Sequence, residues 1–297
     1  MTEHDAIVDA HVHFWELDRF HYPWLADPGA EGLNHDYLPA DLAADIGELP
    51  VRAIVHVQAE MDHALDPAAE TAWLASLKEA GSPGAPTVCV GYADLRSPDL
   101  PDVLDRHEQF ELFRGIRQEA WFDPQSQRAD IPRINLLDDP AWQRGLDELE
   151  RRGLTFDLLV WPAQLEQAAA IFRERPGLPV VVEHLGLPVD PEAREVWRSA
   201  IRAFAQHVPH ALLKISALRF ISPTWDAAEL SPVVAEAIDL FGVDRCMLGS
   251  NFPVDRPAVS YRTVWARFGE SISGFSAVER AAVLHGTAQR FYRISLG

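Results

Sequence analysis

Short apolar runs rich in β-branched residues recur along the chain, and each ends in polar or glycine-containing residues. They cover residues 7–14, 52–60, 87–95, 113–120, 154–160, 179–185, 211–218 and 246–252. The runs are nearly continuous rather than alternating, which is typical of parallel strands that are covered by helices. The pattern therefore predicts eight parallel strands.

Amphipathic segments lie between several of these runs. Residues 66–80 place Ala69, Trp73, Leu74 and Leu77 at helical spacing after a proline that favours a helix start. Similar patterns predict helices over 139–152, with Trp142, Leu146 and Leu149 on one face, and over 191–207, 226–241, 258–269 and 276–291. The pattern thus predicts repeated units of a strand followed by a helix.

Eight such units in 297 residues favour a closed (β/α)8 TIM-type barrel of the α/β class. An open nucleotide-binding sheet would carry a glycine-rich phosphate loop, and neither usual form of that loop occurs. We predict one domain over 1–297, with an irregular loop at 16–39. Because this loop is rich in aromatic residues, Gly and Pro, and follows the first strand on the catalytic side, we expect it to cover the substrate.

Composition narrows the function classes. The formal net charge of −19 argues against nucleic acid and anionic membrane surfaces as partners, since phosphate binding needs clustered cations. Cys89 and Cys246 lie in predicted strands and are expected to be buried thiols, which fits a reducing cytoplasm. No signal peptide or membrane span is predicted. The sequence does not determine whether the protein is a monomer or a homo-oligomer.

The candidate chemistry lies at the strand ends, because the C-terminal ends of barrel strands face the active site. Asp9, His11 and His13 alternate on the first strand and are expected to share one face. The other strands end in Gln58 and Glu60, Arg117, Asp157, Glu183 and His184, Lys214 and Ser216, and Asn251 followed by Asp255. Convergent polar groups in a concave place predict an active site.

Five segments resemble one family. These are DAHVHFWE at 9–16, VVEHLGLP at 181–188, LKISAL at 213–218, MLGSNFPVD at 247–255 and GTAQRFYRI at 286–294. Together they resemble the amidohydrolase superfamily, in particular the branch that holds sugar-acid lactonases and the pyrone-dicarboxylate lactonase. The resemblance spans about residues 7–294 and implies a hydrolytic barrel.

The resemblance also implies roles. His11 and His13 match a metal-binding pair, and His184 matches a histidine that binds metal or polarises substrate. Asn251 stands where the family has an aspartate that takes a proton from water, and an amide cannot act as a base. Asp255 is one substitute. Since strands four and five lack the usual ligands of a two-metal centre, we expect at most one divalent metal, with zinc favoured, and metal-independent action stays open.

The predicted function is hydrolysis of a lactone, the cyclic ester of a small carboxylic or sugar acid. Arg117 is suited to hold a substrate carboxylate, although a structural pairing with Asp157 or Glu119 is an equal alternative. The full set of predicted substrate-binding residues is Trp15, Gln58, Arg117, Asp157 and Lys214. Asp255, Glu60, Glu183 and the histidines are the candidate bases. A metal-dependent decarboxylase and a non-catalytic ligand-binding barrel are the alternatives.

Overall fold

Eight parallel strands form the centre of the molecule in a computed structural model that describes residues 6–125, 133–188 and 194–296. The strands are β1 (Ile7–Val12), β2 (Val51–Val57), β3 (Val88–Gly91), β4 (Phe113–Arg117), β5 (Thr155–Leu158), β6 (Val180–Val182), β7 (Leu212–Ile215) and β8 (Cys246–Leu248). Each pairs with its neighbour in chain order. All eight predicted strands are confirmed.

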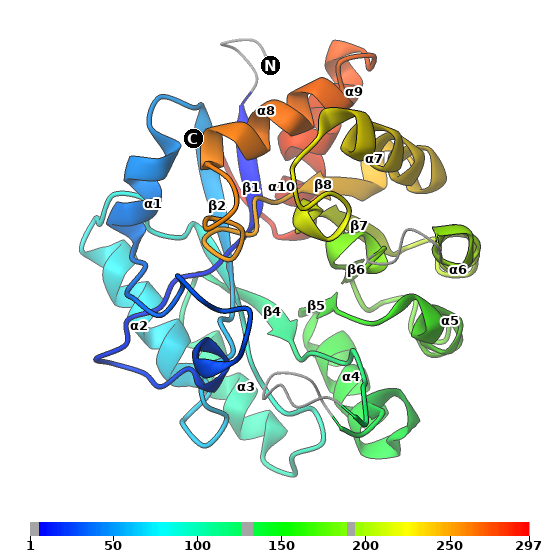
Figure 1. Ribbon diagram of the computed structural model, residues 1–297. Coiled ribbons are helices and arrows are strands. Elements are labelled where there is room, and N and C mark those ends of the chain that lie inside the picture. The colour runs from blue at the N-terminus through cyan, green and yellow to red at the C-terminus, as the bar shows by residue number, and fades with distance from the viewer. Residues whose placement is uncertain (1–5, 126–132, 189–193, 297) are drawn as a thin grey trace.

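The segment after β8 lies against the end of β1 and brings the two edges of the sheet together. The backbone N–H of His13 donates to the carbonyl of Phe252 at 2.8 Å, and the N–H of Asn251 donates to the carbonyl of His11 at 2.9 Å. The sheet is therefore a nearly closed barrel, with helices around it (Figure 1). The predicted (β/α)8 fold is confirmed.

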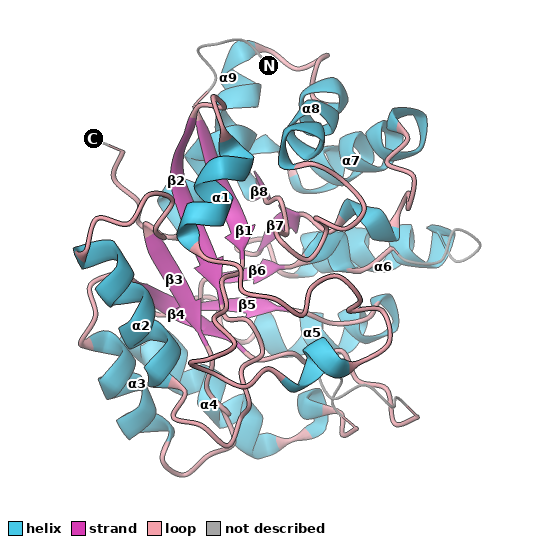
Figure 2. Ribbon diagram, turned by 60° about the vertical axis from the view of Figure 1, so that its left-hand side comes forward, coloured by secondary structure: helices cyan, strands magenta, loops and turns pink. Residues whose placement is uncertain are grey.

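Helices surround the strands, as the side view also shows (Figure 2). They are α1 (Pro39–Ile46), α2 (Ala68–Glu79), α3 (Leu100–Glu108), α4 (Pro140–Arg152), α5 (Leu165–Phe172), α6 (Arg194–His207), α7 (Ala227–Phe241), α8 (Tyr261–Ser271), α9 (Ala277–Ala281) and α10 (Thr287–Phe291). The six predicted helices are present, with a π-helical segment between α9 and α10; residues 191–193 of one prediction lie outside the described part. Helices α1, α3 and α5 were not predicted.

Helix α4 shows how the sequence fixes an element. The side chain of Asp139 caps its first turn by accepting the backbone N–H of Ala141, and Gly153 ends it in the left-handed conformation. Its predicted apolar face is fully buried, as seen for Trp142 and Leu146. None of the helices in the described part of the chain has the length and apolar character needed to cross a bilayer.

The C-terminal segment packs against the strands of the barrel. Phe291 and Tyr292 pack in one buried cluster with valines of β1, β2 and β3. The Tyr292 hydroxyl donates to the Asp157 carboxylate at 2.7 Å. The closing motif at 286–294 thus connects the end of the chain to β5. Cys89 and Cys246 are free and buried, as predicted.

Candidate active site

A cavity opens where the strands end. Its walls come from the ends of several strands and from the loop after β1, which contributes Trp24, Leu33 and residues 27–30. The remaining lining residues are His13, Ala59, Glu60, Arg117, Glu119, Trp121, Leu159, His184, Arg219, Phe220, Asn251 and Val254. The cavity therefore combines apolar walls with histidines, two arginines and several carboxylates.

Three histidines meet at the base of this cavity. The Nε2 atoms of His11 and His13 are 3.0 Å apart, and the His11 and His184 ring centroids are 4.7 Å apart. The Nδ1 atom of His184 is 2.8 Å from the Ser216 hydroxyl. Burial lowers the pKa of all three rings, in His184 to about 4. They are thus neutral imidazoles near pH 7, which is the form that binds metals.

Asp9 does not join these histidines, contrary to the alternation that we expected for the first strand. The register of β1 against β2 shifts between Asp9 and Val12, so simple alternation does not apply to this stretch. The Asp9 carboxylate instead accepts the Ser250 N–H and the Tyr261 hydroxyl, each at 2.8 Å. Asp9 therefore ties β1 to the segment after β8 and to α8.

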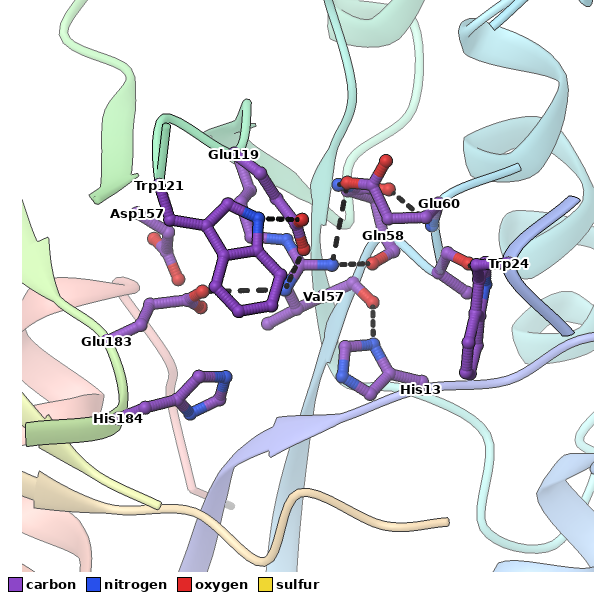
Figure 3. A network of polar contacts seen from close by, with 12 residues as sticks. His13, Trp24, Val57, Gln58, Glu60, Glu119, Trp121, Asp157, Glu183 and His184 are labelled. Carbon is purple, nitrogen blue, oxygen red and sulfur yellow. Dashed lines mark hydrogen bonds and ion pairs between the residues drawn. The ribbon is translucent and has the colours of Figure 1, made fainter. Parts of the chain in front are cut away.

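The contacts of the histidines test whether a metal fits. His13 Nδ1 lies 2.7 Å from the Val57 carbonyl, which only accepts, so neutral His13 keeps a lone pair on Nε2 (Figure 3). His11 Nδ1 lies 3.1 Å from a Glu183 oxygen and 3.3 Å from Lys214 Nζ. If His11 donates to Glu183, the Nε2 lone pairs of His11 and His13 face each other across 3.0 Å. They then repel each other unless a cation binds to both. If Lys214 donates to His11 instead, His11 Nε2 carries the proton to His13.

The residues therefore fit a divalent metal in one tautomer and need none in the other. One ligand atom each from His11, Glu183 and His184 also lie within 4.8 Å of one another. From the sequence we expected His11, His13 and His184 as ligands, and the structure adds the carboxylate of Glu183 beside His11. Whether a metal is bound stays a prediction.

Beneath the histidines lies a set of buried charges, which we name the floor network: Asp157, Glu183, Lys214 and Arg117. Lys214 Nζ donates to Asp157 at 2.6 Å and to Glu183 at 3.3 Å, and the Arg117 guanidinium lies 3.4 Å from Glu183. Burial acts to raise the pKa of Glu183, but His11, Lys214 and Arg117 hold it well below its usual range. Each charge in this set thus faces an opposite charge.

Arg117 is held from several sides. It donates to the Gln58 carbonyl at 2.6 Å and lies 3.6 Å from Glu119 and 3.9 Å from Glu60. The Glu119 carboxylate also accepts the indole N–H of Trp121 (Figure 3). Arg117 therefore has carboxylate partners within the protein itself. Of the two partners expected from the sequence, Glu119 rather than Asp157 lies within ion-pair distance, and Glu183 is closer than either.

Asn251, Asp255 and Arg219 form a second polar group, and Glu60 and His63 form a similar pair. Asn251 Nδ2 donates to Asp255 Oδ1 at 3.2 Å, and Arg219 lies 3.3 Å from the same oxygen. His63 Nε2 lies 2.9 Å from Glu60. We name Asp255–Arg219 and Glu60–His63 the rim pairs.

The structure places the predicted site residues at two depths. His13, His184, Arg117 and Asn251 line the cavity. The other predicted residues are buried outside its lining: His11, Trp15, Gln58, Asp157, Lys214 and Asp255. Trp15 supports the wall from behind, since its ring packs edge-on against Trp24 at 5.5 Å. The roles of all these residues stay predictions.

Outside the predicted loop at 16–39, the charged and aromatic cavity residues that were not predicted are Trp121, Arg219 and Phe220. Each follows within a few residues of a strand end, Trp121 after β4 and the other two after β7. The rule that barrel sites lie just beyond strand ends could have found them.

Comparison with known families shows which family the chain belongs to. The model of the amidohydrolase family matches residues 8–294, almost the whole chain. The chain belongs to this family. The protein is a hydrolase by that membership, and the resemblance found in its motifs is confirmed.

Individual relatives match over nearly their full length. An uncharacterized protein of Sinorhizobium fredii, y4mH, is 39% identical, covering 97% of this chain and 99% of its own. An L-fucono-1,5-lactonase of Burkholderia multivorans is 31% identical, covering 97% and 96% respectively. A crystal structure of an amidohydrolase from Burkholderia multivorans with bound zinc superposes with a TM-score of 0.81 at 29% identity, covering 98% of this chain and all of that one.

Proposed function

We propose that this hydrolase is a lactonase that opens the cyclic ester of a small sugar acid. The observation that carries the proposal is the convergence of His13, His184 and Asn251 on one cavity at the strand ends. Full-length similarity to an L-fucono-1,5-lactonase supports the same reaction class.

The charges of the cavity favour a neutral, hydroxyl-rich substrate. Asp27, Glu60 and Glu119 line it together with two arginines. Arg117 is already engaged by carboxylates, so a carboxylated substrate would compete with the protein for it. Carboxylates accept hydrogen bonds from hydroxyl groups, and Trp24 and Trp121 offer flat apolar surfaces to a sugar ring. We therefore favour a sugar lactone over the carboxylated substrate that the sequence suggested.

The proposed chemistry is addition of water to the lactone carbonyl, followed by cleavage of the ring C–O bond. His184 stabilises the oxygen that becomes negative. The Nε2 lone pair of His13 accepts a hydrogen bond from the attacking water, and the proton that this water gives up passes to the leaving alkoxide. At neutral pH the new acid ionises, so each turnover releases one proton. A divalent metal bound by His11, His13, His184 or Glu183 would add Lewis-acid polarisation of the carbonyl.

A panel of lactones tests the proposal by proton release. Sugar-acid lactones should be hydrolysed faster than carboxylated pyrone lactones. Replacing His184 with Ala should lower kcat by about 100- to 1,000-fold, the usual effect of losing an oxyanion donor. The matched control is His207→Ala on the exposed end of α6, which should leave kcat unchanged.

Three outcomes would contradict this assignment. Unchanged hydrolysis in His184→Ala would remove His184 from the mechanism. Release of carbon dioxide with proton uptake from a carboxylated substrate would favour the decarboxylase alternative, which Asn251 keeps open because that reaction needs no water activation. Binding of sugar lactones without any turnover would favour a ligand-binding barrel.

A further inference from the structure

The amide of Asn251 is held at a defined place beside the histidines. Asn251 lies three residues after the end of β8 and has φ +60°, a left-handed conformation that Asn tolerates better than most residues. Its backbone N–H donates to the His11 carbonyl at 2.9 Å. The side chain therefore starts from a backbone fixed to the strand that carries His11 and His13.

The orientation of this amide follows from its partner. Asn251 Nδ2 lies 3.2 Å from Asp255 Oδ1, and an ionised carboxylate can only accept. The NH2 group is thus directed away from the cavity toward Asp255. The atom left for the cavity is Oδ1, which is a hydrogen-bond acceptor.

Asp255 itself stands behind Asn251. Its side chain has no exposed surface and does not line the cavity. Its second oxygen, Oδ2, is buried without a hydrogen-bond partner among the described residues. A buried carboxylate with an unused oxygen is costly, which points to a role beyond packing.

The charges around Asp255 are few. Arg219, after β7, lies 3.3 Å from Oδ1 and is 30% exposed. Arg256, in the same turn as Asp255, pairs instead with Asp45 of α1 at 3.1 Å. Asp27 of the loop after β1 lines the cavity on which Asn251 and Arg219 also lie.

We propose that Asp255 is a positioning residue that fixes the Asn251 amide, so that Oδ1 accepts a hydrogen bond from the attacking water or a substrate hydroxyl. This inference rests on the proposed lactonase function. It assigns a use to an amide that cannot remove a proton, and it gives a role to a buried carboxylate that lies four residues later and does not line the cavity.

Protonation of Asp255 would reverse the arrangement. A protonated carboxyl can donate to Asn251 Oδ1, which lets the amide turn its NH2 group toward the cavity. Burial raises the pKa of Asp255 to about 7, against the lowering effect of Arg219 and the Asn251 hydrogen bond. The ionised, amide-orienting form is therefore present above this pH, and activity should fall below it.

The test compares two substitutions of Asp255 by the pH profile of kcat/KM on the best lactone of the panel. Asp255→Asn keeps an acceptor for Asn251 but cannot ionise, so it should retain activity within about threefold at pH 8 and lose the acid limb near pH 7. Asp255→Leu removes the acceptor and should lower kcat/KM by about 10- to 100-fold, as for other residues that orient a functional group. Unfolding midpoints show whether each variant is folded.

Arg219→Gln gives a second measurement that does not depend on the folding of Asp255→Leu. Removing this partly exposed cation should move the acid limb to higher pH, since the charge that favours the Asp255 carboxylate is lost. An unmoved limb would overturn the inference. So would Asp255→Asn as inactive as Asp255→Leu, which would mean that the carboxylate takes part directly, or an active Asp255→Leu. If the wild type opens no lactone, the proposed function fails instead.

Discussion

The floor network and the rim pairs use the same chemistry at different depths. In the floor network Lys214, Asp157 and Glu183 are fully buried, and Lys214 contacts both acids. In the rim pairs each carboxylate is mostly buried, whereas its cation reaches solvent: Arg219 is 30% exposed and His63 is 51% exposed. The two regions therefore differ in whether water can replace a missing partner.

This difference in depth predicts two different roles. The floor network holds side chains in place, and the rim pairs adjust the protonation of groups near the cavity. A buried charge that loses its partner cannot be solvated, so the floor network fixes the positions of His11 and Arg117 at a high cost of failure. A rim cation can be replaced by water at little cost, so the rim pairs can adjust protonation without endangering the fold. Single substitutions in each region test whether the two regions have these different roles.

Loss of Lys214 should have the largest effect. Lys214→Met keeps the length of the side chain but removes the cation that Asp157 and Glu183 share, so that only Glu183 keeps a cation, Arg117. We expect the free energy of unfolding to fall by about 3–5 kcal/mol, with loss of hydrolysis. Denaturant unfolding measures this change, and Lys78→Met provides the control, because the exposed Lys78 only donates to the Thr87 carbonyl. An unfolding midpoint equal to that of the control would refute the holding role.

The sequence predicted the strands better than the helices. Long apolar runs define strands, but α1, α3 and α5 have only 8, 9 and 8 residues. Two helical turns carry too few positions for a clear period, and such helices gain their stability from packing against the sheet. Three turns or more, as in α4, gave a recognisable face.

The sequence predicted which residues lie in the site, but not which of them contact one another. Strand ends identified His13, His184 and Arg117, because position in a barrel strand decides which side chains reach the mouth. That Glu183 contacts His11 and Lys214 depends on how β1, β6 and β7 lie together, which the sequence does not state. The Asp255 contact to Asn251 spans only four residues, yet its direction depends on the left-handed backbone at Asn251.

Zinc binding should have an intermediate effect on the free energy of unfolding. A metal between His11 and His13 would tie the floor network to the cavity wall. Zinc at about 100 times its Kd should raise the free energy of unfolding by about 2.7 kcal/mol, and His13→Ala should abolish this gain. Unfolding in zinc and in chelator, with elemental analysis, measures it. If the wild type unfolds equally in both and still opens lactones, His11 donates directly to His13 and no metal is needed.

Loss of His63 should have the smallest effect, and one that depends on pH. Burial acts to lower the pKa of His63, but the hydrogen bond and charge of Glu60 raise it above its usual value of 6.5. A raised pKa in the folded state means that the pair stabilises fully below pH 6.5 and less as pH rises through the folded value. Since His63 is 51% exposed, solvent screens the interaction and limits its contribution.

His63→Gln should therefore lower the free energy of unfolding by less than about 1 kcal/mol at pH 5.5, and by still less at pH 9. Parallel urea titrations at the two pH values measure the difference. A loss at pH 5.5 as large as that of Lys214→Met would show that the rim holds the fold as the floor does. The distinction by depth would then fail, because partial exposure to water would not have made the charge replaceable.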